Sequence, residues 1–289
     1  MRAGRNRTAT SSHCPCSVVG VPTAKIAGAE LYYERRGQGA AMLLLQGLGG
    51  NTLHWGEGFL GALEADFELV LYDHRGAGRS GPLTGEHTIA DLAGDALALL
   101  DALGIDRAHV VGISMGGMVA QEIALLAPER VRTLTLGCTF PGGPQATMTD
   151  TAVIAMLAEA VLSGDQERAT RVGYEVMIAA EYGRQEGAYE LYREVAAQHP
   201  APLPVLMAQL SAIVDHDTSE RLGEVEAPTL VIHGTEDRLM DPSNAELIAR
   251  LLPGARLELL EGSGHMFFWE QPERSARLVR EHAAAAARR

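Results

Sequence analysis

One serine of this chain, Ser114, stands between glycines in the segment Gly112-Ile113-Ser114-Met115-Gly116-Gly117. The segment directly follows an apolar run at 108–111 and precedes a helical pattern, so it is predicted to be a sharp strand-to-helix turn. Flanking glycines let neighbouring backbone approach such a turn, and the serine oxygen then projects at the carboxyl edge of a sheet. This pattern is typical of a nucleophilic serine, and the alternative is a buried, glycine-rich packing turn.

A serine hydroxyl is a weak nucleophile until a base takes its proton, so the chain must also supply a histidine. Of the ten histidines, His265 lies in the glycine-bounded stretch Glu261-Gly262-Ser263-Gly264-His265, just after the last predicted strand. His233 lies inside an apolar strand and His109 at the start of one, where a structural histidine is the ordinary interpretation. We therefore predict that His265 is the base.

The base needs a carboxylate to orient it, and Asp237 is the predicted partner. It follows the apolar strand 229–233, and groups just past the ends of parallel strands gather at the same sheet edge. Glu236 and Asp241 are the alternatives for this role. A solvated aspartate in a turn is the interpretation without a function.

The elements that must position these groups are read from hydrophobic periodicity. Short apolar runs predict strands at 30–34, 41–45, 67–72, 108–113, 131–136, 229–233 and 256–260. Helical spacing predicts helices at 89–103, 115–126, 243–252 and 273–287, two of which stop at a proline. The alternation predicts an α/β protein with a mostly parallel sheet covered by helices on both faces.

The alternation is interrupted at 141–220, where helical periodicity continues without a strand pattern. A block of helices between two strands predicts a helical cap, or lid, over a core made of 25–140 and 221–289. Residues 1–24 are basic at the start but lack an apolar stretch. They are predicted to be a disordered or poorly ordered N-terminal segment and no secretory signal.

Composition excludes several classes of function. The chain has 24 basic against 37 acidic residues, a net charge of -13, which argues against nucleic acid as a partner. No apolar run approaches the roughly 18 residues that cross a bilayer, so no membrane insertion is expected. The three cysteines, Cys14, Cys16 and Cys138, are too few for a disulfide framework and favour a reducing, cytoplasmic location. No metal-binding or phosphate-binding motif is present, so no metal and no cofactor are predicted.

From about residue 29 to the C-terminus the chain resembles the α/β-hydrolase superfamily. The order Ser114, Asp237, His265 agrees with that superfamily. The stretch 73–80 is similar to its D-x-R-G-x-G-x-S loop, and 264–272 is similar to its catalytic-histidine segment. Within the superfamily the chain resembles lid-bearing bacterial esterases of the 3-oxoadipate enol-lactonase type and cofactor-free haloperoxidases. The resemblance implies an α/β-hydrolase fold with an eight-stranded sheet.

The same resemblance implies an oxyanion hole made by the backbone N–H groups of Met115 and Leu48. One such donor is typically worth about 2.7–4 kcal/mol of transition-state stabilisation. The chain departs from the common pattern at Gln46, where many relatives have histidine. His54 and Trp55 follow this loop and could face a substrate, although a tryptophan is more often a core residue.

The expected function is that of a serine hydrolase that cleaves a carboxylic ester or lactone of a small to medium apolar molecule. Serine at this turn argues against the haloalkane dehalogenase and epoxide hydrolase branches, which use aspartate. The alternatives are another reaction at the same site, namely perhydrolysis, C–C hydrolysis or a lyase or cyclase step, and a small-molecule receptor without turnover. The physiological substrate and the oligomeric state are not determined by the sequence.

Overall fold

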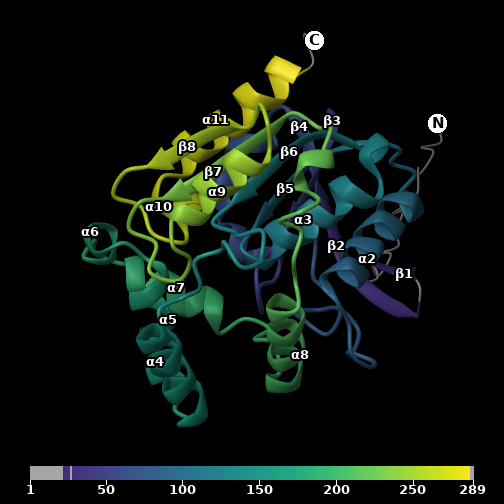
Figure 1. Cartoon of the computed structure of the whole chain (residues 1–289). Helices are drawn as coiled ribbons and strands as arrows, with labels where there is room; N and C mark the ends of the chain where they lie inside the picture. The colour runs from purple at the N-terminus through teal and green to yellow at the C-terminus, as the bar shows by residue number, and fades with distance from the viewer. Residues whose placement is uncertain (1–21, 27, 287–289) are drawn as a thin grey trace, which may run out of the picture.

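The computed structural model describes residues 22–286 except residue 27. Its strands form one eight-stranded sheet in the order β1-β2-β4-β3-β5-β6-β7-β8 (Figure 1). Neighbours from β4 to β8 pair in parallel, whereas β2 pairs antiparallel with both β1 and β4. The strands are β1 Thr23–Ile26, β2 Ala29–Arg36, β3 Ala40–Leu45, β4 Phe67–Tyr72, β5 Ala108–Ile113, β6 Val131–Gly137, β7 Thr229–Gly234 and β8 Arg256–Leu260.

Helices cover both faces of the sheet, because successive side chains of a strand point to opposite faces. Leu43 and Leu45 of β3 belong to one apolar cluster, which includes side chains of α2, α3 and α9. Met42 and Leu44 belong to the other, which includes α1, α10 and α11. These helices are α1 Glu57–Leu63, α2 Ile89–Ala102, α3 Met115–Leu126, α9 Ser243–Leu251, α10 Phe267–Glu270 and α11 Pro272–Ala286. Short 3-10 helices lie at Thr52–Trp55, Pro128–Arg130 and Leu222–Glu224.

The predicted α/β architecture is confirmed, and each predicted strand and core helix matches an observed element within about two residues at its ends. Strand β1 is the one that sequence patterns missed. It has only four residues, Thr23–Ile26, and it pairs at the sheet edge with β2. The boundary predicted for the N-terminal segment, residue 24, therefore falls inside a strand. Residues 1–21 of that segment lie outside the described residues.

Five helices lie between β6 and β7 and are called the inserted helices below. They are α4 Thr151–Leu162, α5 Gln166–Met177, α6 Ala180–Gly183, α7 Ala188–Ala196 and α8 Leu203–Val214. In Figure 1 they lie on one side of the sheet, and α4 and α8 project away from it. None of the helices in the described part of the chain combines the length and hydropathy needed to cross a membrane.

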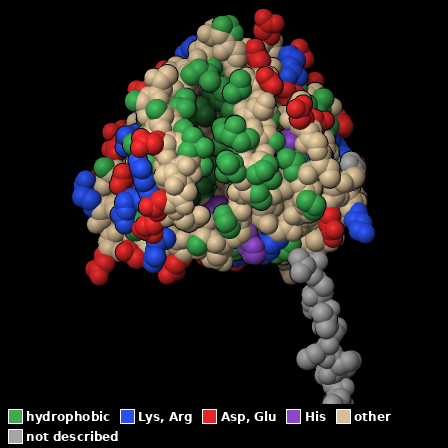
Figure 2. Space-filling model, turned by 90° about the horizontal axis from the view of Figure 1, so that it is seen from below, with side chains coloured by type: hydrophobic (Ala, Val, Ile, Leu, Met, Phe, Trp, Pro, Cys, Tyr) green, Lys and Arg blue, Asp and Glu red, His purple; other side chains and the backbone are tan. Residues whose placement is uncertain are grey.

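The inserted helices expose several large apolar side chains. Figure 2 views this side and shows hydrophobic side chains gathered around a hollow, with most charged groups toward the flanks. Seven large apolar side chains of α4 and α8 are exposed, namely Ile154, Val161, Leu162, Leu203, Met207, Leu210 and Val214. The inserted helices thus present apolar side chains to solvent beside the carboxyl end of the sheet.

Candidate active site

Ser114 lies directly between β5 and α3, in a backbone conformation that side-chain-bearing residues rarely adopt. Its φ is 54° and its ψ is -125°. Two hydrogen bonds hold the turn against the end of β6: Ser114 N–H donates to Gly137 O (2.8 Å), and Thr139 Oγ1 donates to Ser114 O (2.8 Å). The surroundings therefore hold a strained residue in place, a situation that clusters at functional sites.

The glycines of the Gly-x-Ser-x-Gly segment are required by steric contact. A Cβ at Gly112 would lie 2.1 Å from Gly116 O, and a Cβ at Gly116 would lie 2.1 Å from Leu45 O. Both obstacles are backbone atoms, which cannot rotate away as a side chain can. The motif spacing therefore reflects how closely α3 approaches β3 and β5 at this turn.

His265 and Asp237 lie close together although Asp237 precedes β8 in sequence and His265 follows it. His265 Nδ1 lies 2.8 Å from Asp237 Oδ2, and the other carboxylate oxygen, Oδ1, accepts from the N–H groups of Leu239 and Met240 (2.9 Å each). Burial opposes ionisation of Asp237, but the neighbouring His265 and His233 hold the pKa of Asp237 well below the ordinary value. Because an ionised carboxylate only accepts, His265 Nδ1 carries the proton, which leaves Nε2 free to act as a base.

A second histidine, His233, contacts the same carboxylate. Its Nε2 lies 3.1 Å from Asp237 Oδ2 and 3.0 Å from Met240 O, and both neighbours are acceptors. His233 Nε2 is therefore protonated, and within the described residues its Nδ1 has no partner. The sequence analysis treated His233 as an ordinary core histidine. One sequence feature could have indicated this contact: His233 lies only four residues before Asp237. The turn after a strand can fold back and bring two such residues together.

Neither alternative to Asp237 makes a hydrogen bond with His265 within the described residues. Glu236 is placed by its backbone N–H, which donates to Ser263 O, and Asp241 Oδ1 accepts from Ser243 N–H at the start of α9. Asp241 thus stabilises the first turn of a helix, an ordinary role for aspartate. Of the three carboxylates considered, the structure places Asp237 against the histidine.

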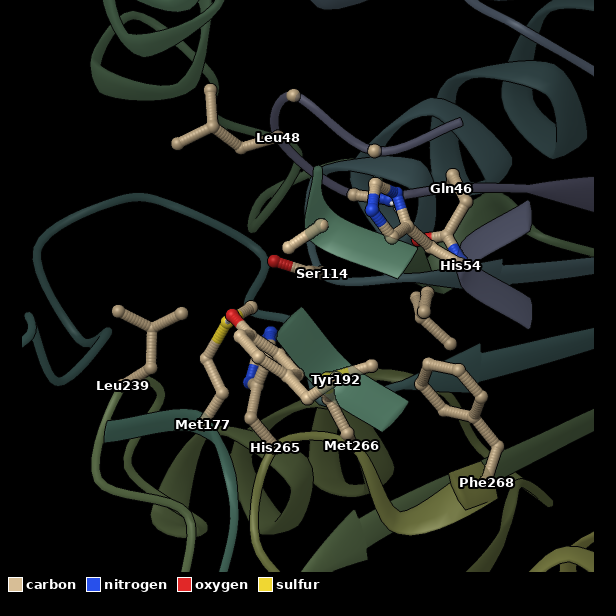
Figure 3. Close-up of a pocket in the computed structure, with 15 residues that line it drawn as sticks. Gln46, Leu48, His54, Ser114, Met177, Tyr192, Leu239, His265, Met266 and Phe268 are labelled. Carbon is tan, nitrogen blue, oxygen red and sulfur yellow. Dashed lines mark hydrogen bonds between the residues drawn. The ribbon is translucent and has the colours of Figure 1, made fainter. Parts of the chain in front are cut away.

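Ser114 and His265 line one cavity of about 200 Å³, whose other walls are mostly apolar (Figure 3). Leu48 and His54 also line it, whereas Trp55 is a core residue stacked on Phe59. The remaining lining residues are Gln46, Gly47, Gly49, Gly50, Ile113, Met177, Tyr192, Ala196, Leu239, Met266 and Phe268. The inserted helices supply Met177, Tyr192 and Ala196, so they form part of the wall.

The amide of Leu48 stands out in the loop that follows β3. The N–H groups of Gly47, Gly49, Gly50 and Asn51 each donate to an acceptor, respectively Gln46 Oε1, Gln209 Oε1, Gly47 O and His54 Nδ1. Among the described residues, the Leu48 N–H donates no hydrogen bond. The Met115 N–H occupies the first turn of α3, where helix geometry provides no acceptor. Both amides predicted for an oxyanion hole are thus available to donate.

Gln46 performs a local role at the position where the resemblance would favour histidine. Its Oε1 accepts from Gly47 N–H (2.9 Å), while its Nε2 is buried and lacks a partner in the part of the chain that the structure describes. His54 accepts from Asn51 N–H through Nδ1, and burial lowers the pKa of His54 to about 4. His54 is therefore neutral near pH 7, with its proton on Nε2.

Glu270 joins the His265 loop to the inserted helices and was not singled out from the sequence. Its carboxylate accepts from Gly264 N–H (3.1 Å) and from Ala179 N–H (3.4 Å). Burial raises the pKa of Glu270 to about 7, although these two N–H groups favour the ionised form. The residue preceding His265 is thus fastened to a carboxyl group that changes charge near neutral pH.

Cys138, His233 and Asp237 form a buried group whose potential metal ligands lie within 4.8 Å of one another. A metal would need the thiolate form of Cys138, but burial and then the charge of Asp237 raise the pKa of that thiol well above its usual value. The Asp237 oxygens are already occupied by N–H donors. This donor set fits a hydrogen-bonded cluster better than a metal centre, and the absence of a metal from the function stays a prediction.

Comparison with known proteins places these features in a family. The sequence family described as alpha/beta hydrolase fold matches residues 40–272. A protein of Azorhizobium caulinodans named "Putative carbamate hydrolase RutD" is 31% identical over 256 residues, which cover 88% of this chain and 94% of that protein.

Solved structures agree. The crystal structure of a hydrolase from Pseudomonas aeruginosa has a TM-score of 0.79 and 31% identity, and the match covers 92% of this chain and 99% of the other. The enol-lactonase from Burkholderia xenovorans has a TM-score of 0.79 and 26% identity, over 91% of this chain and all of that one (100%). The match therefore includes the sheet and the inserted helices in each case.

Proposed function

The chain belongs to the α/β-hydrolase family and is a hydrolase, and we propose that it cleaves a carboxylic ester or lactone through an acyl-enzyme on Ser114. The observation that carries the proposal is the 2.8 Å contact between His265 Nδ1 and Asp237 Oδ2 beside a cavity that Ser114 also lines. This arrangement provides a nucleophile, a base and a group that orients the base. The similarity to an enol-lactonase supports the ester or lactone class.

In the proposed reaction His265 Nε2 takes the proton from Ser114 Oγ as this oxygen attacks the substrate carbonyl. The negative charge that develops on the carbonyl oxygen is stabilised by the Leu48 and Met115 amides. Asp237 keeps the proton of His265 on Nδ1 and stabilises the imidazolium that forms. His265 then protonates the leaving alkoxide, and water, activated by the same imidazole, releases the acyl group.

The cavity favours a small to medium apolar substrate. Its walls contain few polar groups besides Ser114, His265 and His54, and a volume of about 200 Å³ excludes large ligands from the space beside the serine. We infer that the inserted helices act as a lid, because Met177 and Tyr192 close one side of the cavity (Figure 3). The proposed steps require no cofactor, because they use groups of the chain and water.

A carbamate is the second candidate substrate. It is favoured by the relative from Azorhizobium caulinodans, which is named as a carbamate hydrolase. A carbamate carbonyl is attacked in the same way, but nitrogen donation makes it less electrophilic and the departing group differs. The two candidates therefore share Ser114 and His265 and differ in substrate alone.

The proposal is tested by comparing wild type with Ser114→Ala. A fluorophosphonate probe should label the wild type at Ser114 and should not label the variant. A panel of p-nitrophenyl esters, small lactones and carbamates should be hydrolysed by the wild type, with rates at least about 10³-fold lower in the variant. Equal rates in both proteins, or labelling at another residue, would exclude the proposed nucleophile. The relative rates on esters and carbamates decide between the two candidates.

A further inference from the structure

Helix α8 has a buried polar side chain, that of Gln209. This side chain contacts the loop that contains Leu48. Gln209 is fully buried (0% exposed), although Met207 and Leu210 beside it are exposed. Its Oε1 accepts a 2.8 Å hydrogen bond from Gly49 N–H, which is 160 residues away in sequence. The contact joins an inserted helix to the residue next to the proposed oxyanion donor.

Two further contacts join the loop that contains Leu48 to the segment 198–209. Gly49 has a φ of 66°, and a Cβ there would lie 2.6 Å from Cδ2 of Leu206, one helical turn before Gln209. Asn51 Nδ2 donates to Gln198 O (3.0 Å) in the connection that leads to α8. The loop is thus held by the segment 198–209 from outside and by β3 from inside.

The Leu48 N–H lies in the rigid peptide plane between Gly47 and Leu48, so its direction depends on how the next plane, between Leu48 and Gly49, is held. The plane between Leu48 and Gly49 contains the Gly49 N–H, which Gln209 holds. Rotation of that plane would break the Gly49 hydrogen bond and alter the backbone at Leu48. Without Gln209, Gly49 N–H would lose its acceptor, and the loop could rotate to seek another one.

We propose that Gln209 is a positioning residue that makes formation of the oxyanion hole depend on the docking of α8. The inference rests on the proposed hydrolase mechanism and adds a role for an inserted helix. When α8 is docked, Gln209 fixes Gly49, and the Leu48 N–H points toward the developing oxyanion. When α8 moves away, the loop loses this support while Ser114, His265 and Asp237 stay on the core strands and their loops. A substrate that contacts the apolar face of α8 and stabilises its docked position would therefore also stabilise the oxyanion hole, through the hydrogen bond between Gln209 and Gly49.

The decisive variant is Gln209→Met, which keeps the length and helix propensity of the side chain but removes the acceptor. We expect kcat to fall by about 10–100-fold, toward the loss seen when an oxyanion donor is removed, while KM changes less than about threefold. Gln209→Glu retains an acceptor with the same reach and should recover most of the activity. In the described structure the Gln209 Nε2 has no partner, so the lost N–H group removes no bond.

Ser211→Ala is the matched control, because Ser211 lies on the same helix and is exposed. It should behave as wild type. Gln209→Asn provides an independent test if the Met variant folds poorly, because the shorter side chain cannot reach Gly49 and should lower kcat in the same way.

Binding of two inhibitors shows whether Gln209 positions the oxyanion hole or only stabilises the surrounding structure. A boronic acid forms a tetrahedral adduct with Ser114 and places an oxygen in the oxyanion hole, whereas the product carboxylic acid binds as a ground-state ligand. In Gln209→Met the boronate should bind about 10-fold or more weakly, and the product affinity should stay within about threefold of wild type. Rates of fluorophosphonate labelling should fall in parallel with kcat.

Three results would overturn the proposal. One is a folded Gln209→Met or Gln209→Asn protein with wild-type kcat and boronate affinity. Another is equal weakening of boronate and product binding, which would indicate general distortion of the cavity. The third is a Gln209→Glu protein as impaired as Gln209→Met. Failure of the hydrolase proposal itself would look different, because the wild type would then neither turn over the ester panel nor react with the probe.

Discussion

His233 Nε2 lies 3.1 Å from Asp237 Oδ2, the oxygen that also lies 2.8 Å from His265 Nδ1. With the Leu239 and Met240 amides on the other oxygen, each of these four hydrogen bonds to the carboxylate, all within the described residues, comes from a donor. Such a site selects an ionised carboxylate and disfavours an amide of the same shape, because the amide must turn its own N–H group toward another donor.

Asp237→Asn should therefore lower kcat by about 10³–10⁴-fold, since the amide cannot hold the His265 tautomer that leaves Nε2 free. Steady-state kinetics on the best ester substrate provide the measurement. Glu236→Gln is the matched control and should stay within about threefold of wild type, because in the described structure the carboxylate hydrogen-bonded to His265 is that of Asp237. A similar loss in both variants would contradict the assignment of the acid.

At low pH the wild type should lose stability, because Asp237 becomes protonated. The pKa of Asp237 is lower in the folded chain than in the unfolded chain, so its contribution to stability is present above the unfolded pKa, about 4. It is lost as pH falls further toward the folded pKa. The difference in the free energy of unfolding between wild type and Asp237→Asn should be constant from pH 5 to 7 and should shrink below pH 4. Urea titrations at several pH values measure it, and a difference that grows in acid would contradict the depressed pKa.

Glu270 should make the protein less stable as pH rises from about 4.5 to 7, whereas Asp237 makes it less stable as pH falls. The pKa of Glu270 is raised to about 7 in the folded chain, so the folded state binds more protons than the unfolded state between about pH 4.5 and 7, and stability falls across that range. Glu270→Gln removes the titration and should gain on the order of 1–2 kcal/mol relative to wild type between pH 5 and 8, a figure reduced for partial exposure. Melting temperatures of both proteins across this range provide the check. A constant difference would show that Glu270 titrates at its ordinary pKa.

Gly116→Ala should destabilise the protein by more than about 3 kcal/mol or prevent folding, because the new Cβ would collide with the backbone oxygen of Leu45. Gly61→Ala in α1 is the matched control. A Cβ at Gly61 meets no atom within 4 Å, so this change should be neutral or stabilise the helix by up to about 1 kcal/mol. Denaturant unfolding of the two variants compares them directly. Equal stability would contradict the close approach of α3 to β3.

Cys138 should be unreactive in the folded protein, because its thiol is buried and its pKa is raised well above the usual value. Iodoacetamide at pH 8 should modify Cys138 slowly in buffer and rapidly in a denaturing concentration of urea. Mass spectrometry of the peptide that contains Cys138 distinguishes it from Cys14 and Cys16. Rapid modification of the folded protein would show that the cluster around Asp237 opens to solvent.

Much of the fold could be predicted from the sequence because it depends on local patterns. Apolar runs such as 108–113 and 229–233 indicate strands buried on both faces, and the prolines at 128 and 253 indicate helix ends. The glycines around Ser114 reflect a steric requirement at a single turn. Strand β1 was missed because four residues at a sheet edge carry almost no periodic signal.

The sequence alone therefore determined the order of seven of the eight strands and of four core helices, and it supplied the candidates Ser114, Asp237 and His265, whose spacing follows the ends of strands. Tertiary structure alone decided which groups meet across long separations. The contact of Glu270 with Ala179 and that of Gln209 with Gly49 join segments 91 and 160 residues apart. The position of His233 also depends on how the turn after β7 folds back onto the strand. Such hydrogen bonds need only one donor and one acceptor at the right place in space, so they leave no periodic pattern along the chain.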